Sequence, residues 1–162
     1  MNTALRNDVI LLKPLHIQEA AAFYDLYVQN GYIEKKPTQP QEYLKAAKTF
    51  TQHILSLCQH VFTIRTMLNP QLVIGDCALH HWDVKKQEME IGGTLLPAYW
   101  GKGIMREAFI LLEDFVRKEY QIISLVAHTE VSNHKALRLA EKLGFTKTTL
   151  SGDTISLKKQ IN

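Results

Sequence analysis

Residues 97–105 place two glycines and a lysine where an apolar strand pattern gives way to a helical one. Gly101 and Gly103 allow the backbone to turn sharply and to approach a ligand closely. The free N–H groups at a helix N-terminus attract phosphate groups, and Lys102 and Arg106 add positive charge nearby. The spacing matches neither the P-loop nor the dinucleotide-binding glycine motif. Taken alone, the segment is either a candidate pyrophosphate site or a tight connection.

Two carboxylates and two histidines form a second group of residues suited to chemistry. Glu88 and Glu90 are two positions apart in an expected strand, so their side chains share one face of it. Either carboxylate could serve as a general base, although both would equally suit a solvated face. His80 is a secondary candidate, with His81 beside it, because imidazole titrates near neutral pH. We expect no metal site from His80, His81 and His128.

The apolar periodicity predicts an α/β chain with the order βααβββαβαββ, in which helices pack on a mixed sheet. Helical spacing favours four helices, at residues 17–28, 42–59, 103–120 and 133–143. Short β-rich runs predict seven strands, at residues 9–12, 61–66, 72–79, 88–96, 122–127, 146–150 and 154–158. Cys58 then falls in a helix and Cys77 in a strand, where both would be buried, reduced thiols.

Length and composition fit one domain spanning residues 1–162. The chain has 162 residues, 46% of them hydrophobic, and a formal net charge of +3. The apolar runs are too short for a membrane span, and residues 1–8 lack the pattern of a signal peptide, so we expect a cytoplasmic protein. The lysine pairs are scattered rather than gathered into a stripe, which disfavours a nucleic acid partner.

Several motifs together resemble the GNAT superfamily of acetyl-CoA-dependent N-acetyltransferases, in its ribosomal-protein N-terminal acetyltransferase (RimJ/RimL-like) branch. The resemblance covers residues 9–145. It rests on the sequences LKPL at residues 12–15, EA at 19–20, EIG at 90–92 and YWGKGIM at 99–105, and on Asn133 followed by Gly144-Phe145. It implies a central mixed sheet with helices on both faces, acetyl-CoA as co-substrate and a primary amine as acceptor. It also makes Glu90, at the family's Glu-Ile-Gly position, the first candidate for the general base.

The resemblance also implies where acetyl-CoA would bind. The family's pyrophosphate-loop pattern falls on residues 100–105, where Trp100 and Met105 depart from the usual residue types. Asn133 would lie beside the pantetheine arm, or would serve as a helix N-cap. Backbone groups of Thr94, Leu95 and Leu96 would bond the arm, which slots between two splayed strands. The expected cofactor-binding residues are Thr94, Leu95, Leu96, Trp100, Gly101, Lys102, Gly103, Ile104, Met105, Arg106 and Asn133.

The general acid is where this sequence departs from the family. Members place a tyrosine or a serine after the conserved asparagine to protonate the leaving thiolate, but those positions here are Ala140 and Ala136. Ser132 is a weak candidate for the role, as is His134. A non-catalytic module that binds or senses CoA is therefore the first alternative reading, and a basic RNA-binding domain is the second.

The resemblance implies that the acceptor site is built by the first two helices, the loop between them and the last hairpin. Polar and aromatic residues occur in the first part of that region, which suits a cationic amine and equally suits ordinary packing: Tyr27, Tyr32, Glu34 and Tyr43. A protein N-terminus and a small-molecule amine both stay open as acceptors. A monomer and a homodimer are both compatible with the sequence.

Overall fold

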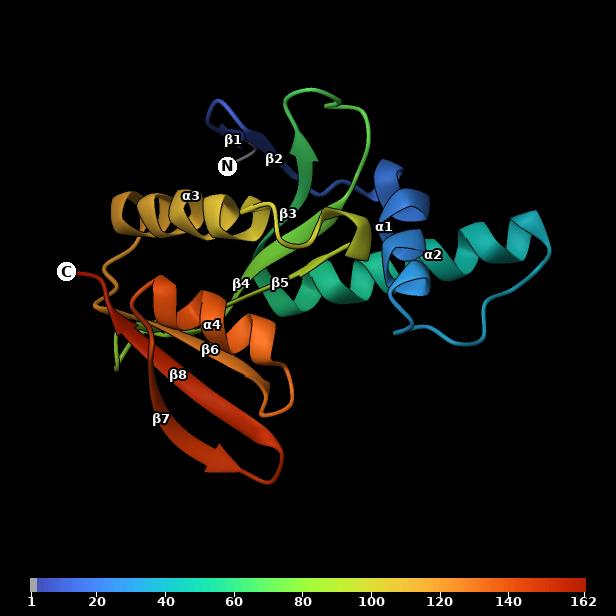
Figure 1. The fold of residues 1–162 in the computed structure, drawn as a ribbon. Coiled ribbons are helices and arrows are strands. Elements are labelled where there is room, and N and C mark those ends of the chain that lie inside the picture. The colour runs from blue at the N-terminus through green and yellow to red at the C-terminus, as the bar shows by residue number, and fades with distance from the viewer. Residues whose placement is uncertain (1–2) are drawn as a thin grey trace.

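The computed structural model describes residues 3–162, which form one eight-stranded mixed sheet in the order β1-β2-β3-β4-β5-β6-β8-β7 (Figure 1). The strands are β1 (Leu5–Arg6), β2 (Ile10–Pro14), β3 (Cys58–Thr66), β4 (Gly75–Asp83), β5 (Glu88–Leu95), β6 (Ser124–Glu130), β7 (Thr146–Ser151) and β8 (Thr154–Gln160). The helices are α1 (Ala20–Gln29), α2 (Pro40–Leu57), α3 (Ile104–Glu119) and α4 (His134–Lys142). Single 3₁₀ turns precede α1 (Ile17–Glu19) and α3 (Pro97–Tyr99).

The predicted order of elements is confirmed, with one short strand, β1, added before it. Several boundaries differ from the prediction, and two of the differences have a clear physical cause. Cys58 begins β3 rather than lying in α2, because its backbone is extended and pairs with His80 of β4. The strand expected at residues 72–79 begins only at Gly75, since the Leu72 N–H closes a turn onto the Asn69 carbonyl.

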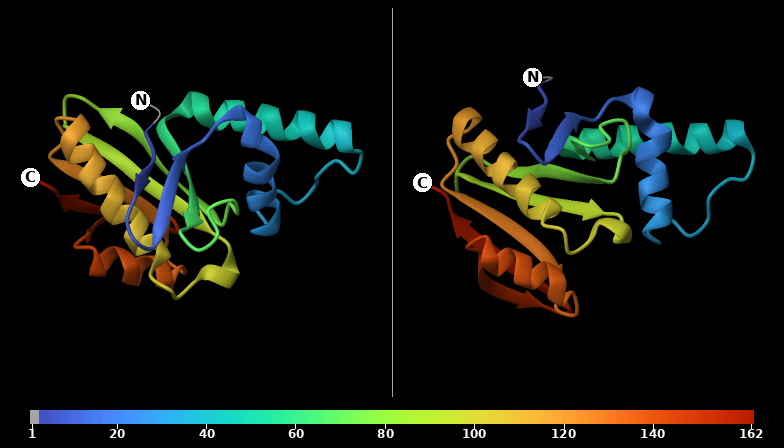
Figure 2. Two further views of the ribbon diagram at one scale, coloured as in Figure 1. Left: turned by 90° about the horizontal axis from the view of Figure 1, so that it is seen from above. Right: turned by 45° about the horizontal axis from the view of Figure 1, so that its top comes forward.

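One connection in the sheet is a parallel crossover, and it creates the site described below. The chain leaves β5, passes through α3 and returns as β6, which lies parallel to β5. The other strand pairs are antiparallel. The β5–β6 pairing covers only three residue pairs, from Glu88–Ser124 to Glu90–Val126, and both strands continue beyond it. The right-hand view of Figure 2 shows the two strands starting side by side and then separating into a fork.

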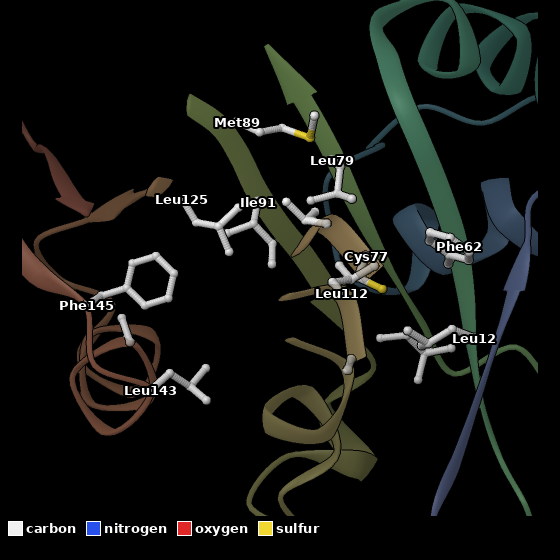
Figure 3. Packing of buried hydrophobic residues seen from close by; sticks show 14 of the residues in the cluster. Leu12, Phe62, Cys77, Leu79, Met89, Ile91, Leu112, Leu125, Leu143 and Phe145 are labelled. Atoms are coloured by element: carbon white, nitrogen blue, oxygen red, sulfur yellow. The ribbon is translucent and has the colours of Figure 1, made fainter. Parts of the chain in front are cut away.

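Two helices cover each face of the sheet, as expected. On one face, α3 and α4 pack on a large core, in which Leu79 lies near Met89 and Leu125 lies beside Ile91 (Figure 3). In α3 the buried residues recur at four-residue intervals and form one apolar stripe: Ile104, Ala108, Leu112 and Val116. On the opposite face, α1 and α2 pack on β3 and β4 through smaller clusters around Phe23 and Tyr24.

The described helices carry polar faces of the kind expected for packing on a sheet. Within residues 3–162, none of them combines the length and the hydrophobicity that a bilayer-spanning helix requires.

Candidate active site

The fork between β5 and β6 exposes backbone groups in the middle of the sheet. The Leu96 N–H donates to the Ile74 carbonyl at 2.9 Å, so the backbone of Leu96 faces β4. Because backbone groups alternate along a strand, Thr94 faces β4 as well, whereas Gly93 and Leu95 face the opening. Gly93 is exposed although it lies in an inner strand. Of the three residues expected to bond the pantetheine arm, only Leu95 thus presents its backbone to the fork.

The glycine loop lies at the open end of this fork, where β5 leads into α3. Gly101 and Gly103 have φ values of +75° and +76°, a region that favours glycine, and Gly103 is the N-cap residue of α3. A Cβ atom at either position would meet nothing within 4 Å. The loop is therefore shaped by backbone conformation, and its amide groups at the start of α3 are accessible to a ligand.

Trp100 connects this loop to both sides of the fork. Its indole Nε1 donates to the Leu95 carbonyl at 2.8 Å. The ammonium group of Lys135, in the first turn of α4, lies 4.9 Å from the centre of the indole ring. The departure from the family's usual residue at this position thus has a structural role, since the indole ties the loop to β5 and to α4.

Met105 departs from the usual small residue, and Gly93 compensates for it. A Cβ atom on Gly93 would lie 2.9 Å from the Met105 Sδ atom and 2.8 Å from the Asp76 carbonyl oxygen. The long side chain of Met105 therefore occupies space that the missing Cβ leaves open. This contact packs the first turn of α3 against β5.

Asn133 is the N-cap of α4. Its side-chain oxygen accepts a hydrogen bond from the Ala136 N–H at 3.1 Å. The structure therefore shows the helix N-cap role that the sequence offered as the alternative to a place beside the pantetheine arm. Ser132 is exposed in the turn before it. Ser132 lies in the turn after β6 ends at Glu130, and about 13 Å of extended strand separates Glu130 from Val126 at the closed end of the fork.

Glu90 lies at the closed end of the fork, among three histidines. Its Oε1 atom is 3.1 Å from His128 Nε2. Its Oε2 atom is 3.2 Å from the Nδ1 atoms of both His80 and His81. His128 Nδ1 in turn pairs with the Ser156 hydroxyl at 2.8 Å. The sequence-predicted base and the secondary candidate are thus in direct contact.

His80 and Glu88 differ in how the surroundings affect them. Burial lowers the pKa of His80, and the neighbouring Glu90 carboxylate opposes that effect. The ring of His80 lies over Gly92, with Nε2 3.8 Å from the place a Cβ atom there would take. Glu88 instead forms an ion pair with Lys158 and accepts a hydrogen bond from Ser124, and the Lys158 contact is the main reason its pKa is lowered. Glu90 is therefore the carboxylate that faces histidines rather than a lysine.

A buried carboxyl that the sequence reasoning missed lies next to β5. Asp76 of β4 accepts a 2.5 Å hydrogen bond from the Tyr27 hydroxyl of α1. Burial raises the pKa of Asp76 to about 6, although hydrogen bonds from Tyr27 and the Thr94 backbone oppose the rise. Burial, followed by the nearby Asp76 charge, raises the pKa of Tyr27. Tyr27 and Asp76 are 49 positions apart, so a local sequence pattern cannot predict their contact.

This combination of a forked sheet, a glycine loop at a helix start and a carboxylate at the fork matches a known family. The model of the acetyltransferase (GNAT) domain matches residues 10–146. The chain belongs to the GNAT acetyltransferase family. Membership confirms the predicted enzyme class, an N-acetyltransferase that uses acetyl-CoA as co-substrate.

Solved GNAT structures share the fold over nearly the whole chain. RimL, a ribosomal L7/L12 alpha-N-protein acetyltransferase in complex with coenzyme A, has a TM-score of 0.77 at 16% identity, and the match covers 98% of each chain. The microcin C7 self-immunity acetyltransferase MccE, in complex with acetyl-CoA and AMP, has a TM-score of 0.73 at 20% identity, with 96% of this chain and 94% of that chain covered. A spermidine N-acetyltransferase SpeG chimera from Vibrio cholerae and hSSAT has a TM-score of 0.72 at 18% identity, with 94% and 95% covered. At these identities the likeness is one of fold, and it confirms the predicted fold class.

Proposed function

We propose that this GNAT chain transfers the acetyl group of acetyl-CoA to a primary amine, with Glu90 accepting the amine proton. The observation that carries the proposal is the end of the β5–β6 pairing at Glu90–Val126, which opens the sheet directly beside the Glu90 carboxylate. A linear arm that entered the fork would run along β5 and end next to the base. Amine and thioester would then meet at the closed end of the fork.

The residues present fit acetyl-CoA at three points. The amide groups of the glycine loop suit the pyrophosphate because they lie at the positive end of α3, and Lys102 and Arg106 add cationic side chains within two residues before and after its first residue. The backbone of Gly93 and Leu95 faces the fork and suits the amide groups of the pantetheine arm, as in the addition of an extended strand. Asn133 lies at the start of α4, on the far side of the fork, where its side chain already caps the helix.

Catalysis requires a neutral amine, so a base must accept a proton directly or through water. Glu90 suits this role because it lies at the closed end of the fork and because Glu88 is engaged by Lys158. The imidazole of His80 contacts Glu90 through Nδ1 and extends over Gly92. It would hold the carboxylate in place beside the bound thioester. The oxygen of the tetrahedral intermediate would be stabilised by a backbone N–H that faces the fork.

Solvent suits the role of proton donor to the leaving thiolate. Ala136 and Ala140 provide no acid, and Ser132 lies at the open end of the fork. An ordinary thiol has a pKa near 8.5, so a thiolate is a moderate leaving group that water can protonate. This proposal needs no further acid from the chain.

The acceptor suited to the described side chains is an amine that arrives as a cation. Glu90 supplies a carboxylate on the sheet face that α1 and α2 cover, and the buried Asp76–Tyr27 pair lies on the same face. RimL acts on a ribosomal protein N-terminus and SpeG on spermidine, so both kinds of amine occur among proteins of this fold. We keep a protein N-terminus and a small-molecule amine as the two acceptor classes.

The test is a thiol-release assay with acetyl-CoA and two acceptor panels, one of peptides with free N-termini and one of polyamines. We expect release with members of one panel, and a loss of kcat of at least about 100-fold in Glu90→Gln. Glu119→Gln, an exposed carboxylate at the far end of α3, is the matched control and should keep the wild-type rate. Tight acetyl-CoA binding without turnover on any amine would instead support a non-catalytic CoA-binding module.

A further inference from the structure

From the sequence, the side chains of His80 and His81 are expected on opposite faces of the sheet, because neighbouring residues of a strand alternate between faces. The structure overrides this rule with a β-bulge. The β4–β5 register shifts between His80 and Asp83, and His81 takes a φ of +50°. A bulge of this kind redirects a side chain, and positive φ costs free energy in a residue with a Cβ atom. Here it brings the two imidazoles to the same carboxylate.

Three potential ligand atoms converge as a result. The Nδ1 atoms of His80 and His81 are 2.6 Å apart, and each is 3.2 Å from Glu90 Oε2. A zinc ion that is bound tetrahedrally at about 2.0–2.1 Å needs its ligand atoms about 3.3–3.5 Å apart. Both distances to the carboxylate nearly meet that value. The two nitrogens must separate by less than about 1 Å, which a small rotation of the exposed His81 ring achieves.

In contrast to the expectation of no metal site at these histidines, we propose that His80, His81 and Glu90 bind one divalent transition-metal ion, for which zinc is the reference ion. Two imidazoles and one carboxylate favour zinc, copper or nickel over magnesium or calcium, which prefer oxygen ligands alone. The side chain of His81 is 73% exposed, so the site has a path to solvent and leaves a coordination position for water.

A second layer of contacts orients the carboxylate for this role. Glu90 Oε1 pairs with His128 Nε2, and His128 Nδ1 pairs with Ser156 Oγ. The other carboxylate oxygen, Oε2, is thereby directed toward His80 and His81. Contacts that hold a ligand in this way contribute about 10–100-fold to metal affinity in known sites.

Metal binding would inhibit acetyl transfer, and this consequence rests on the proposed function. A cation on Glu90 Oε2 occupies the lone pair that would accept the amine proton. The protein would then be active without the metal and inhibited with it. Chelation would restore the activity.

The first experiment measures Zn²⁺ binding to the chelator-treated full chain by competition with a chromophoric zinc indicator. We expect one Zn²⁺ per chain, unaffected by millimolar Mg²⁺, and an affinity at least about tenfold lower in His81→Gly. Glycine suits the φ of +50° at this position, so this variant retains the fold. His53→Ala removes an exposed histidine of α2 and should bind zinc like the wild type.

Two results would overturn the site. One is the absence of stoichiometric Zn²⁺ binding by the wild type. The other is binding that survives both His81→Gly and Glu90→Gln but disappears in Cys58→Ser, because Cys58 pairs with His80 in the sheet and would supply a thiolate instead.

The second experiment separates this inference from the proposed function. With an accepted amine, Zn²⁺ should inhibit the wild type, a chelator should reverse the inhibition, and His81→Gly should require at least about tenfold more zinc. Zinc binding as expected with no acetylation of any amine would contradict only the proposed function. Acetylation without zinc binding, or zinc binding without inhibition, would contradict the inference.

Discussion

The hydroxyl of Tyr27 donates a 2.5 Å hydrogen bond to the carboxyl of Asp76, and this contact fastens α1 to β4 beneath the fork. Asp76 is 4% exposed, and the Thr94 backbone also bonds its carboxyl. Tyr27 therefore supplies one of the hydrogen bonds that hold a buried carboxyl beside β5. The pair links α1 to β4, and the Thr94 backbone extends this link to β5, the strand proposed to hold acetyl-CoA.

Asp76 should make the stability of the protein depend on pH. Its pKa of about 6 in the folded state lies above the ordinary value of 3.8, so between these values the folded state binds more protons than the unfolded state. The stabilisation is complete below about pH 4 and is lost as the pH rises through about 6. The full difference corresponds to about 3 kcal/mol.

Urea denaturation of the wild type and Asp76→Asn at a series of pH values measures this effect. Asparagine does not ionise, so the free energy of unfolding of the wild type should fall relative to the variant between about pH 4 and pH 7. Parallel curves for the two proteins would show that Asp76 keeps an ordinary pKa.

Removing the Tyr27 hydroxyl should destabilise the fold, because it leaves an oxygen of the buried Asp76 carboxyl without that donor. We expect Tyr27→Phe to lose about 1–3 kcal/mol of unfolding free energy at pH 7.5. Tyr32→Phe makes the same chemical change at a side chain that is 69% exposed and should stay within about 0.5 kcal/mol of the wild type. Equal effects of the two substitutions would mean that the Tyr27 hydrogen bond contributes nothing specific.

Gly93 and Met105 should be energetically coupled, since a Cβ atom at Gly93 would lie 2.9 Å from the Met105 Sδ atom. Gly93→Ala should cost more than about 1 kcal/mol of unfolding free energy. The cost should be smaller by about 0.5 kcal/mol or more in a Met105→Ala background. Some cost should persist there, because the Asp76 carbonyl oxygen would still lie 2.8 Å from the added atom. Strictly additive effects in the double-mutant cycle would exclude the contact.

Local sequence signals predicted the helices that are proposed to hold acetyl-CoA. Gly103 marks the start of α3 and Asn133 the start of α4, and both signals depend on the backbone conformation of one residue and its near neighbours. The assignment of Cys58 to a helix failed because helical spacing continues up to that residue, whereas its pairing with His80 decides its conformation. A local residue pattern cannot predict which strands, distant in sequence, will pair in the sheet.

The contacts among the candidate catalytic residues could be predicted only in part for the same reason. Glu90 was proposed from its match to the family's Glu-Ile-Gly motif and His80 from its residue type near the end of a strand. The convergence of His81 on them depends on a bulge, and the contact of His128 with Glu90 depends on the register of a parallel pair that the chain reaches through α3. Asp76 and Tyr27 meet only after α1 has packed on the sheet. Each of these contacts is a product of tertiary structure.

The central claim, that acetyl-CoA binds along the fork with its pyrophosphate at the glycine loop, is tested most directly by calorimetric titration with acetyl-CoA. Gly103→Glu and Gly152→Glu introduce the same charge at residues that both have positive φ and nothing within 4 Å of an added Cβ, but only Gly103 lies in the loop. We predict micromolar affinity for the wild type and for Gly152→Glu, and an affinity at least about tenfold lower for Gly103→Glu. Equal affinities of the two variants, or no binding by folded wild-type protein at millimolar acetyl-CoA, would contradict the claim.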